Sequence, residues 1–329
     1  ENPLRPAWLG TKEGLTDAVP APWTPLRVGR ETTDQRPQTK DHRLQTLNVS
    51  CWGRVYDFAR GLLPSEVTTR GASVLAAPIA LKGSADGRPI AWTAAPAKVT
   101  QAKPNVVRLA GSAASGALKL DGTALVEYDG MVRVDLALTP AKAEVAVQEL
   151  TLEIPIRAEH AKYLYHFPGR WGSVANSGSV PKEGWGHAFK PFIWLGDEER
   201  GLSWFCESDE NWLPAENAKA LTVDPEGPVT TLRCHLIAAE TKISKPLKYT
   251  FGFQATPVKQ PEKTVWDYRI THHGSYGLES QRSVSGGKIA YPAAGHVRRE
   301  EGTFECWYRP AVDSERPLPF EKRQYGGNR

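Results

Sequence analysis

The side chains with the greatest chemical potential are concentrated between residues 163 and 212. Five tryptophans lie there, out of eleven in the whole chain: Trp171, Trp185, Trp194, Trp204 and Trp212. Flat aromatic rings stack on the apolar C–H faces of sugar rings, while neighbouring polar groups bind sugar hydroxyls. Trp171, Trp185 and Trp212 occur in glycine-rich or irregular sequence, which makes them candidates for a sugar-binding platform. The alternative is that they fill the core, where Trp194 and Trp204, inside predicted strands, are expected.

The same stretch ends in the sequence CESDENW, which carries an acidic pair, Asp209 and Glu210. Glycoside hydrolysis uses two carboxyl groups on either side of the scissile bond, whereas consecutive residues of an extended chain point in opposite directions. Adjacent acids suit the substrate-assisted variant, in which the substrate acetamide is the nucleophile. Asp209, Glu210 and His187 are therefore the candidate catalytic residues, and Asp209 is also a candidate for substrate binding. In the alternative, Asp209 caps a turn and Glu210 is solvated.

The sequence gives no sign of a metal or cofactor site. It contains no HxH or HExxH pattern, no CxxC pair among its four cysteines, and no phosphate-binding or dinucleotide-binding glycine motif. We therefore predict neither a metal nor a cofactor. Cys206 and Cys234 both lie in predicted strands, where they either pair or remain small buried residues.

Composition limits the class of protein. With 329 residues, 40% of them hydrophobic, the chain has enough apolar material for a sizeable core. The net charge of +4 is small and no Lys/Arg run is interleaved with aromatics, so a nucleic-acid partner is not expected. No stretch approaches about eighteen consecutive apolar residues, so no membrane span is expected. The sequence starts with Glu1, which fits either a mature chain after signal removal or a chain trimmed at its start, and we predict a secreted, periplasmic or cell-surface protein.

Turn signals and period-two alternation predict many short strands. Asp-Gly, the strongest short hairpin signal, occurs at Asp86-Gly87, Asp121-Gly122 and Asp129-Gly130. Residues 145–156 alternate apolar and polar side chains over a long half-buried strand. Residues 168–188 contain many glycines and are predicted to be a long loop, the kind of segment that carries sites on a β scaffold. Further strands are predicted at 48–58, 73–82, 118–120, 123–128, 131–138, 189–195, 201–207, 229–238, 247–256 and 302–309.

Strands at roughly ten-residue intervals, without βαβ alternation, indicate an all-β fold, a large antiparallel β-sandwich of the supersandwich kind. The run PVKQPEK at 257–263 marks its end. Too few strands follow for an independent core, so we expect an incomplete C-terminal jelly-roll segment. The predicted organisation is an extended lead-in at 1–44, the β-sandwich at 45–256, a linker at 257–282 and a truncated concanavalin/laminin-G-like segment at 283–329.

Several segments resemble the N-terminal β-sandwich domain of family-123-type glycoside hydrolases and their uncharacterised bacterial relatives. They are PAPWTPLRV at 20–28, CWGRVYDF at 51–58, VLAAPIAL at 74–81 and GWGHAFKPFIWLGDEERGLSWFCESDENW at 184–212. The piece GKIAYPAAGHVRREEGTFECWYRP at 287–310 resembles the opening strands of a laminin-G or concanavalin-like jelly roll. In such relatives a catalytic (β/α) barrel follows and carries the adjacent Asp and Glu that hydrolyse N-acetylhexosaminides. The residues after position 256 are too few for eight βα units.

The resemblance implies a carbohydrate-processing parent protein of bacterial origin. We predict a carbohydrate-associated, non-catalytic module, whose partners are a glycan and its own downstream catalytic domain. Two alternatives stay open: a self-sufficient glycoside-acting enzyme that uses Asp209 and Glu210, and a structural surface or assembly protein. Converging carboxylates in a deep cleft would favour the enzyme, an exposed flat tryptophan strip without acids would favour binding, and a large apolar outer patch would favour assembly.

Overall fold

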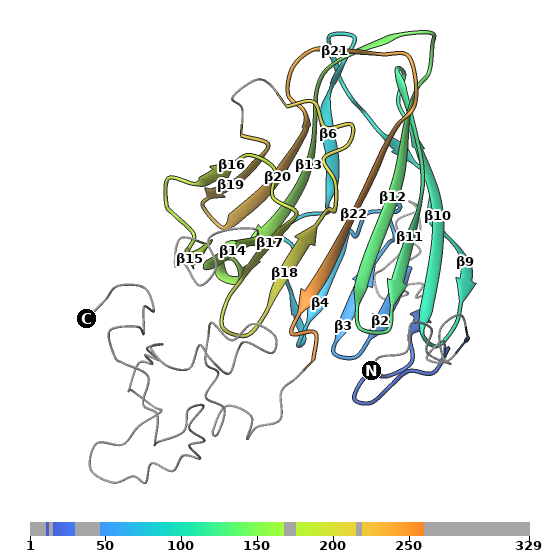
Figure 1. Ribbon diagram of the computed structural model, residues 1–329, viewed down its shortest axis with the longest axis vertical. Coiled ribbons are helices and arrows are strands. Elements are labelled where there is room, and N and C mark those ends of the chain that lie inside the picture. The colour runs from blue at the N-terminus through green and yellow to red at the C-terminus, as the bar shows by residue number, and fades with distance from the viewer. Residues whose placement is uncertain (1–10, 13–15, 30–46, 168–175, 215–218, 260–329) are drawn as a thin grey trace, which may run out of the picture. The chain divides into compact units, whose positions relative to one another are not determined.

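The computed structural model describes residues 11–12, 16–29, 47–167, 176–214 and 219–259 (Figure 1). Within these residues, 22 strands form three antiparallel sheets, and one complete 3-10 turn is present, η1 (Ala158–His160). The predicted all-β fold and antiparallel sandwich are therefore confirmed. Among the described residues, no helix is long and apolar enough to cross a membrane.

The largest sheet has ten strands in the described part of the chain, in the order β15-β14-β17-β18-β22-β12-β11-β10-β8, with β9 also pairing with β10. Strand β22 joins its two halves, because it pairs with β12 on one side and with β18 on the other. The strands are β8 (Thr93–Ala94), β9 (Lys98–Ala102), β10 (Val106–Ala114), β11 (Leu118–Glu127), β12 (Met131–Pro140), β14 (Tyr163–Phe167), β15 (Ser177–Ser179), β17 (Phe192–Gly196), β18 (Gly201–Phe205) and β22 (Leu247–Thr256).

The second large sheet has seven described strands, in the order β16-β19-β20-β13-β6-β7, with β21 also pairing with β13. Its longest strand, β13, alternates buried and partly exposed residues along nearly its whole length, which confirms the half-buried strand predicted at 145–156. The strands are β6 (Ala80–Ala85), β7 (Arg88–Pro89), β13 (Val145–Arg157), β16 (Trp185–His187), β19 (Leu221–Glu226), β20 (Val229–Ile237) and β21 (Thr241–Ile243).

A small meander near the N-terminus forms the third sheet, with five described strands in sequence order. The strands are β1 (Arg27–Gly29), β2 (Asn48–Cys51), β3 (Arg54–Asp57), β4 (Glu66–Thr69) and β5 (Ala72–Ser73). Two of its side chains tie it to the ten-stranded sheet. Arg54, only 2% exposed, donates to the carbonyl oxygens of Ala255 (3.1 Å) and Val258 (3.0 Å). The fully buried hydroxyl of Tyr56 donates to the carbonyl of Gly130 (2.6 Å) and accepts from the N–H of Ala255 (3.1 Å).

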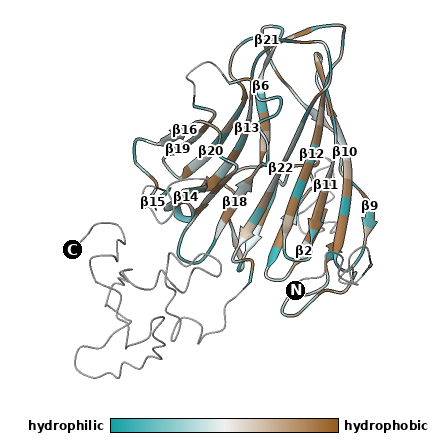
Figure 2. Ribbon diagram, viewed as in Figure 1, coloured by the Kyte–Doolittle hydropathy of each residue, from teal (hydrophilic) through white to brown (hydrophobic). Residues whose placement is uncertain are grey.

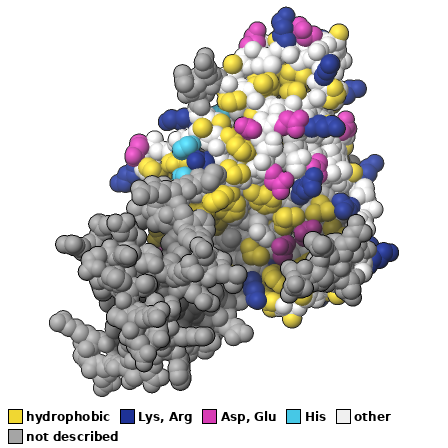
Figure 3. All heavy atoms as spheres, in the orientation of Figure 1, with side chains coloured by type: hydrophobic (Ala, Val, Ile, Leu, Met, Phe, Trp, Pro, Cys, Tyr) yellow, Lys and Arg dark blue, Asp and Glu magenta, His cyan; other side chains and the backbone are white. Residues whose placement is uncertain are grey.

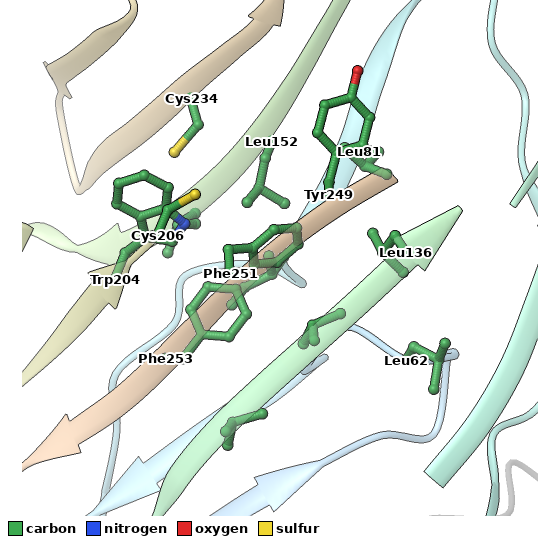
Figure 4. Close-up of a cluster of buried hydrophobic side chains, with 14 of the residues drawn as sticks. Leu62, Leu81, Leu136, Leu152, Trp204, Cys206, Cys234, Tyr249, Phe251 and Phe253 are labelled. Atoms are coloured by element: carbon green, nitrogen blue, oxygen red, sulfur yellow. The ribbon is translucent and has the colours of Figure 1, made fainter. Parts of the chain in front are cut away.

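The core lies between the two large sheets. Hydrophobic residues are concentrated along their strands (Figure 2). Figure 4 shows Leu152 of β13 and Cys234 of β20 beside Trp204 of β18 and Phe251 and Phe253 of β22, so both sheets contribute to one cluster. Large apolar side chains removed from water in this way supply the main driving force for folding.

The Asp-Gly hairpin signals were correct at two of the three positions. Asp86 and Gly87 both adopt positive φ (50° and 70°) between β6 and β7, as a two-residue hairpin requires. Gly130, with φ 82°, closes the β11–β12 hairpin. Asp121-Gly122 is not a turn, because β11 runs straight through it and pairs on both sides. Gly122 is required there for a different reason, since an added Cβ would overlap the backbone carbonyl of Asp135 on β12.

Three other strand predictions were wrong in detail. The strand expected at 48–58 is the β2–β3 hairpin, because Gly53 adopts φ 71° and reverses the chain. The strand expected at 73–82 is divided between β5 and β6, with Pro78 in the gap. The loop expected at 168–188 contains the short strands β15 and β16, while its residues 168–175 lie outside the described part. The predicted hairpin around residues 196–200 is confirmed as β17 and β18.

The chain divides into two units between Lys259 and Gln260. All residues of the second unit lie outside the described part of the chain. The linker at 257–282 and the jelly-roll segment at 283–329 therefore stay predictions.

The close contact between β6 and β13 predicts that replacing Gly83 lowers stability. A Cβ at this position would overlap the backbone carbonyl of Glu149, and backbone yields less easily than a side chain. We expect Gly83→Ala to lower the free energy of unfolding by about 1–3 kcal/mol, as overpacking does, in urea titrations. Gly116→Ala is the matched control, since a Cβ at that exposed glycine meets no atom within 4 Å. Equal stability of the two variants would contradict the packing described here.

Candidate functional site

Trp185 and His187 lie on β16, the terminal described strand of the seven-stranded sheet. In the antiparallel register Trp185 is opposite Val223 and His187 is opposite Leu221, and both of these partners are fully buried. Opposed residues of an antiparallel pair project to the same side, so Trp185 and His187 project to the inner side of the sandwich. Trp185 is half-buried and His187 is exposed. The pair therefore lies where the core meets solvent.

The ring of His166, on β14 of the ten-stranded sheet, completes a three-ring group. Its centroid lies 5.3 Å from that of Trp185 and 5.9 Å from that of His187, and Trp185 stacks with His187 at 5.9 Å. His166 is 6% exposed. We call these three residues the end cluster, because they join the outer strands of the two sheets (Figure 1). Figure 3 shows histidine side chains at the surface in the region of β16 and β19.

Trp212 lies elsewhere, in the core. It is 9% exposed and its ring lies 6.0 Å from that of Trp204 and 5.3 Å from that of Phe189, edge-on. Its faces are therefore occupied by protein, and the structure does not bring it into one platform with Trp185. Trp171 lies outside the described residues, so its place in the predicted platform stays a prediction.

Asp209 and Glu210 lie on the exposed segment that follows β18. The carbonyl of Asp209 accepts the N–H of Trp212 (2.9 Å), and the N–H of Glu210 donates to the Ser208 hydroxyl (3.0 Å). Both side chains are exposed, at consecutive positions of a turn. The pair is thus presented to solvent, and neither residue has the burial that raises the pKa of a general-acid carboxyl group.

The strongest charged network is on the outer face of the seven-stranded sheet. Arg233 of β20 donates to three carboxylates, those of Glu153 (3.2 Å), Asp224 (2.7 Å) and Glu226 (3.0 Å). A cleft of about 530 Å³ opens beside it, and His235 is among its lining residues. Burial lowers the pKa of His235, which favours the neutral ring. Three of the guanidinium N–H groups are engaged, so this network is suited to bracing β13, β19 and β20.

The β17–β18 hairpin is held by a part-buried hydrogen bond between His160 and Asp197. His160 Nδ1 lies 2.7 Å from Asp197 Oδ2, and the other oxygen of that carboxylate accepts backbone N–H groups of Glu199 and Arg200. Burial raises the pKa of Asp197, but the hydrogen bonds from His160 and from the two backbone N–H groups outweigh burial and hold this pKa below its ordinary value. The pair orients the turn between two strands that border the end cluster.

The exposed aromatic residues of β14 were not predicted from the sequence, and Trp194 was predicted on the wrong face of its strand. Trp194 was expected in the core, but it projects to the outer face of β17, opposite Tyr165 of β14. Tyr165 and Phe167 are 37% and 42% exposed, and neither was singled out. The signal lay in β17 and β18, where both faces carry apolar residues (FIWLG and GLSWF), so periodicity could not distinguish the core face from the solvent face.

No cluster of three or more His, Cys, Asp or Glu side chains suited to a metal ion occurs among the described residues. Cys206 and Cys234 are both buried free thiols in the structure, so of the two possibilities left open for them it is the small buried residue that is found. Burial raises the pKa of Cys206 to about 11, which keeps the thiol protonated and weakly nucleophilic at neutral pH.

The described structure is thus an antiparallel supersandwich with an aromatic and imidazole group at the outer strands of its two sheets. Residues 43–218 match the family described as glycoside hydrolase 123, third domain, and the chain belongs to this family. The match confirms the resemblance to family-123-type glycoside hydrolases, although it is to a third domain and not to an N-terminal one. The laminin-G-like segment stays a prediction. A search of curated protein sequences found no match.

Solved structures with a similar course of the chain have low identity. A putative aldose 1-epimerase from Klebsiella pneumoniae is 10% identical, with a TM-score of 0.46 over 70% of this chain and 84% of that one. The Slr1438 protein from Synechocystis sp. PCC 6803 is also 10% identical, with a TM-score of 0.44 over 67% of this chain and 98% of that one. Galactose 1-epimerase from Lactobacillus acidophilus is 9% identical, with a TM-score of 0.39 over 70% and 98%.

The burial of Trp212 predicts a structural phenotype. Trp212→Ala should lower the free energy of unfolding by about 3–5 kcal/mol, as the loss of a buried aromatic residue does, measured by urea unfolding. Trp185→Ala should cost less, because that ring is half-buried. A smaller loss for Trp212→Ala than for Trp185→Ala would contradict the packing of Trp212 against Trp204.

The low pKa of Asp197 predicts how stability depends on pH. A carboxylate with a depressed native pKa contributes stability above its unfolded pKa, and this contribution is lost as pH falls through the native value. We expect Asp197→Asn to be less stable than the parent by about 1 kcal/mol at pH 7, with the difference closing below about pH 4. Glu159→Gln is the control, because this exposed carboxylate lies 3.8 Å from the same His160 ring. A difference that persists at low pH would argue against the ionic origin.

Proposed function

We propose that this sandwich is a non-catalytic, glycan-binding module of a family-123-type glycoside hydrolase, with the end cluster as a sugar contact. The observation that carries the proposal is the half-buried ring of Trp185, which contacts the rings of His166 and His187 where strands of the two sheets meet. An anchored aromatic ring with one accessible side suits the apolar face of a pyranose. Imidazole nitrogens beside it supply donors and acceptors for sugar hydroxyls.

The position of the rings favours binding over structure alone. His187 is exposed although it projects to the inner side of β16, which indicates that the sandwich is open at this point. A ligand there would contact side chains from both sheets, since His166 comes from β14 and Trp185 from β16. Sites that bridge two rigid elements keep their geometry without the entropy cost of ordering a loop.

Hydrolysis by this chain is the less favoured function. Among the described residues, Asp209 and Glu210 form a solvent-exposed turn and not a pair of carboxylates facing each other across a cleft. We therefore assign the chemistry to a catalytic domain of the parent protein. The sandwich would hold substrate near that domain and raise its effective concentration.

The test is binding of N-acetylhexosamine oligosaccharides, scored by glycan array and isothermal titration, to the chain and to Trp185→Ala. We expect the variant to lose about tenfold in affinity, since one aromatic contact contributes on the order of 1 kcal/mol. Trp52→Ala is the matched control, because Trp52 is also half-buried but lies in the β2–β3 turn of the small sheet.

The same experiment distinguishes the alternatives. Release of reducing sugar that is abolished in Asp209→Asn would make the chain an enzyme and overturn the proposal. Unchanged affinity in Trp185→Ala would remove the end cluster as a sugar contact.

A further inference from the structure

A second aromatic group covers the outer face at one end of the ten-stranded sheet. Trp194 is opposite Tyr165, and Phe192 is opposite both Phe167 and Phe205, so these side chains leave the sheet on the same side. We call this group the aromatic strip; its members are Tyr163, Tyr165, Phe167, Phe192, Trp194 and Phe205. Figure 3 shows hydrophobic side chains gathered over β17 and β18.

The strip is on the opposite side from the core. The residues that alternate with it, including Leu164, Ile193 and Trp204, are 6%, 0% and 1% exposed. Tyr165 and Phe167 are exposed, and the other four members are partly exposed. The strip is therefore a solvent-facing surface and a different place from the end cluster.

The rings lie low on the sheet because glycines lie beneath them. A Cβ at Gly196 would overlap the six-membered ring of Trp194, and one at Gly201 would come within 2.6 Å of its Nε1. A Cβ at Gly252 would likewise overlap the ring of Phe205. Trp194 is fixed further by a hydrogen bond from Nε1 to the Thr256 hydroxyl (3.0 Å). Rings seated on the backbone in this way turn a face outward, which is the geometry for stacking on a sugar.

The composition of the face identifies the kind of ligand. Besides the strip, the outward positions of β17, β18 and the end of β22 are Gly196, Gly201, Ser203, Gly252, Gln254 and Thr256. None of these six positions is aliphatic or charged, and along β22 the first charged residue on this face is Lys248. Protein-binding surfaces are enriched in Met and Arg as well as in aromatics. Aromatic rings with hydroxyl and amide groups beside them match a sugar, whose faces are apolar and whose edges carry hydroxyls.

Among the described residues, the charges nearest to the strip lie at its borders, and two pairs of them form ion pairs. At the hairpin end, Glu198 accepts from Lys162 (3.0 Å) and from the Tyr163 hydroxyl (2.7 Å). The hydrogen bond from the Tyr163 hydroxyl is the largest of the interactions that lower the pKa of Glu198 to about 2. On the far side, Arg133 of β12 is paired with Asp135 (2.9 Å). The surface between these borders offers no described counter-charge, so it favours an uncharged ligand over a sulfated or uronic one.

We propose that the aromatic strip is a platform for a neutral oligosaccharide chain several sugar units long. The strip and its polar border cross β14, β17, β18 and β22, three inter-strand spacings or about 14 Å, which exceeds one sugar ring. This proposal rests on the proposed function in that the module meets glycans, but it assigns a second surface and the charge and length of the ligand.

The test compares chitobiose, chitohexaose and cellohexaose, with a sulfated heparin hexasaccharide as the charged probe, by isothermal titration. We expect the parent protein to bind the neutral hexasaccharides about tenfold more tightly than the disaccharide. It should bind the sulfated hexasaccharide more weakly than the neutral hexasaccharides. The double variant Tyr165→Ala/Phe167→Ala should lose this gain with length and retain its disaccharide affinity. Trp185→Ala should instead weaken disaccharide and hexasaccharide alike.

Controls separate ring contact from folding. If the double variant does not fold, the single variants Tyr165→Ala and Phe167→Ala replace it, and their thermal midpoints are measured. Tyr165→Phe, which keeps the ring, should bind as the parent does. Unchanged hexasaccharide affinity in folded strip variants overturns the platform while leaving the end cluster untouched. A dimer that becomes a monomer in the double variant, with glycan binding unchanged, makes the strip a protein contact and also overturns it. No binding of any neutral hexasaccharide overturns it as well.

Discussion

The position of the small sheet against the ten-stranded sheet depends on two buried polar side chains of one short strand, Arg54 and Tyr56 of β3. Ala255 of β22 is bonded on both sides, because its N–H donates to Tyr56 and its carbonyl accepts from Arg54. The same tyrosine donates to Gly130, in the β11–β12 turn, and a Cβ at Gly130 would come within 2.7 Å of the Arg54 guanidinium. Loss of either side chain would leave buried carbonyl groups without partners, at about 1–3 kcal/mol each. The small meander is thus fixed against the strand that joins the two halves of the ten-stranded sheet.

Two strands of the ten-stranded sheet divide their residues between the inner side and the aromatic strip, and one of them, β14, contributes to both proposed sugar-binding surfaces. β22 supplies Phe251 and Phe253 to the core and Gly252 and Gln254 to the outer face. β14 divides its residues in the same way, giving His166 to the end cluster and Tyr165 to the aromatic strip. Because strand neighbours point to opposite faces, one rigid element positions both surfaces. A glycan-binding role needs such fixed geometry more than it needs reactive groups.

The sequence predicted the fold well and the site only in part, for reasons that particular residues make plain. Long alternation in β13 and the glycine turn at Asp86-Gly87 are local signals, and both were correct. Gly122 produced a false turn, because close approach to a neighbouring strand and a reversed chain both require glycine. Trp194 and Trp204 belong to apolar strands of one hairpin, yet one faces solvent and the other the core. Only the pairing of β17 with β14 and β18 determines which of the two rings faces solvent, and that pairing is non-local.

The glycines under the rings carry a consequence for how such domains diverge. Trp194 fills the space above Gly196 and Gly201, and Phe205 fills the space above Gly252. A side chain at any of these glycines would displace a ring, whereas loss of a ring would uncover backbone that nothing else shields. Each ring and the glycine beneath it therefore constrain each other. Among related domains the aromatic residue and the glycine beneath it should be retained together or replaced together, and a lineage that abandons the surface should lose both.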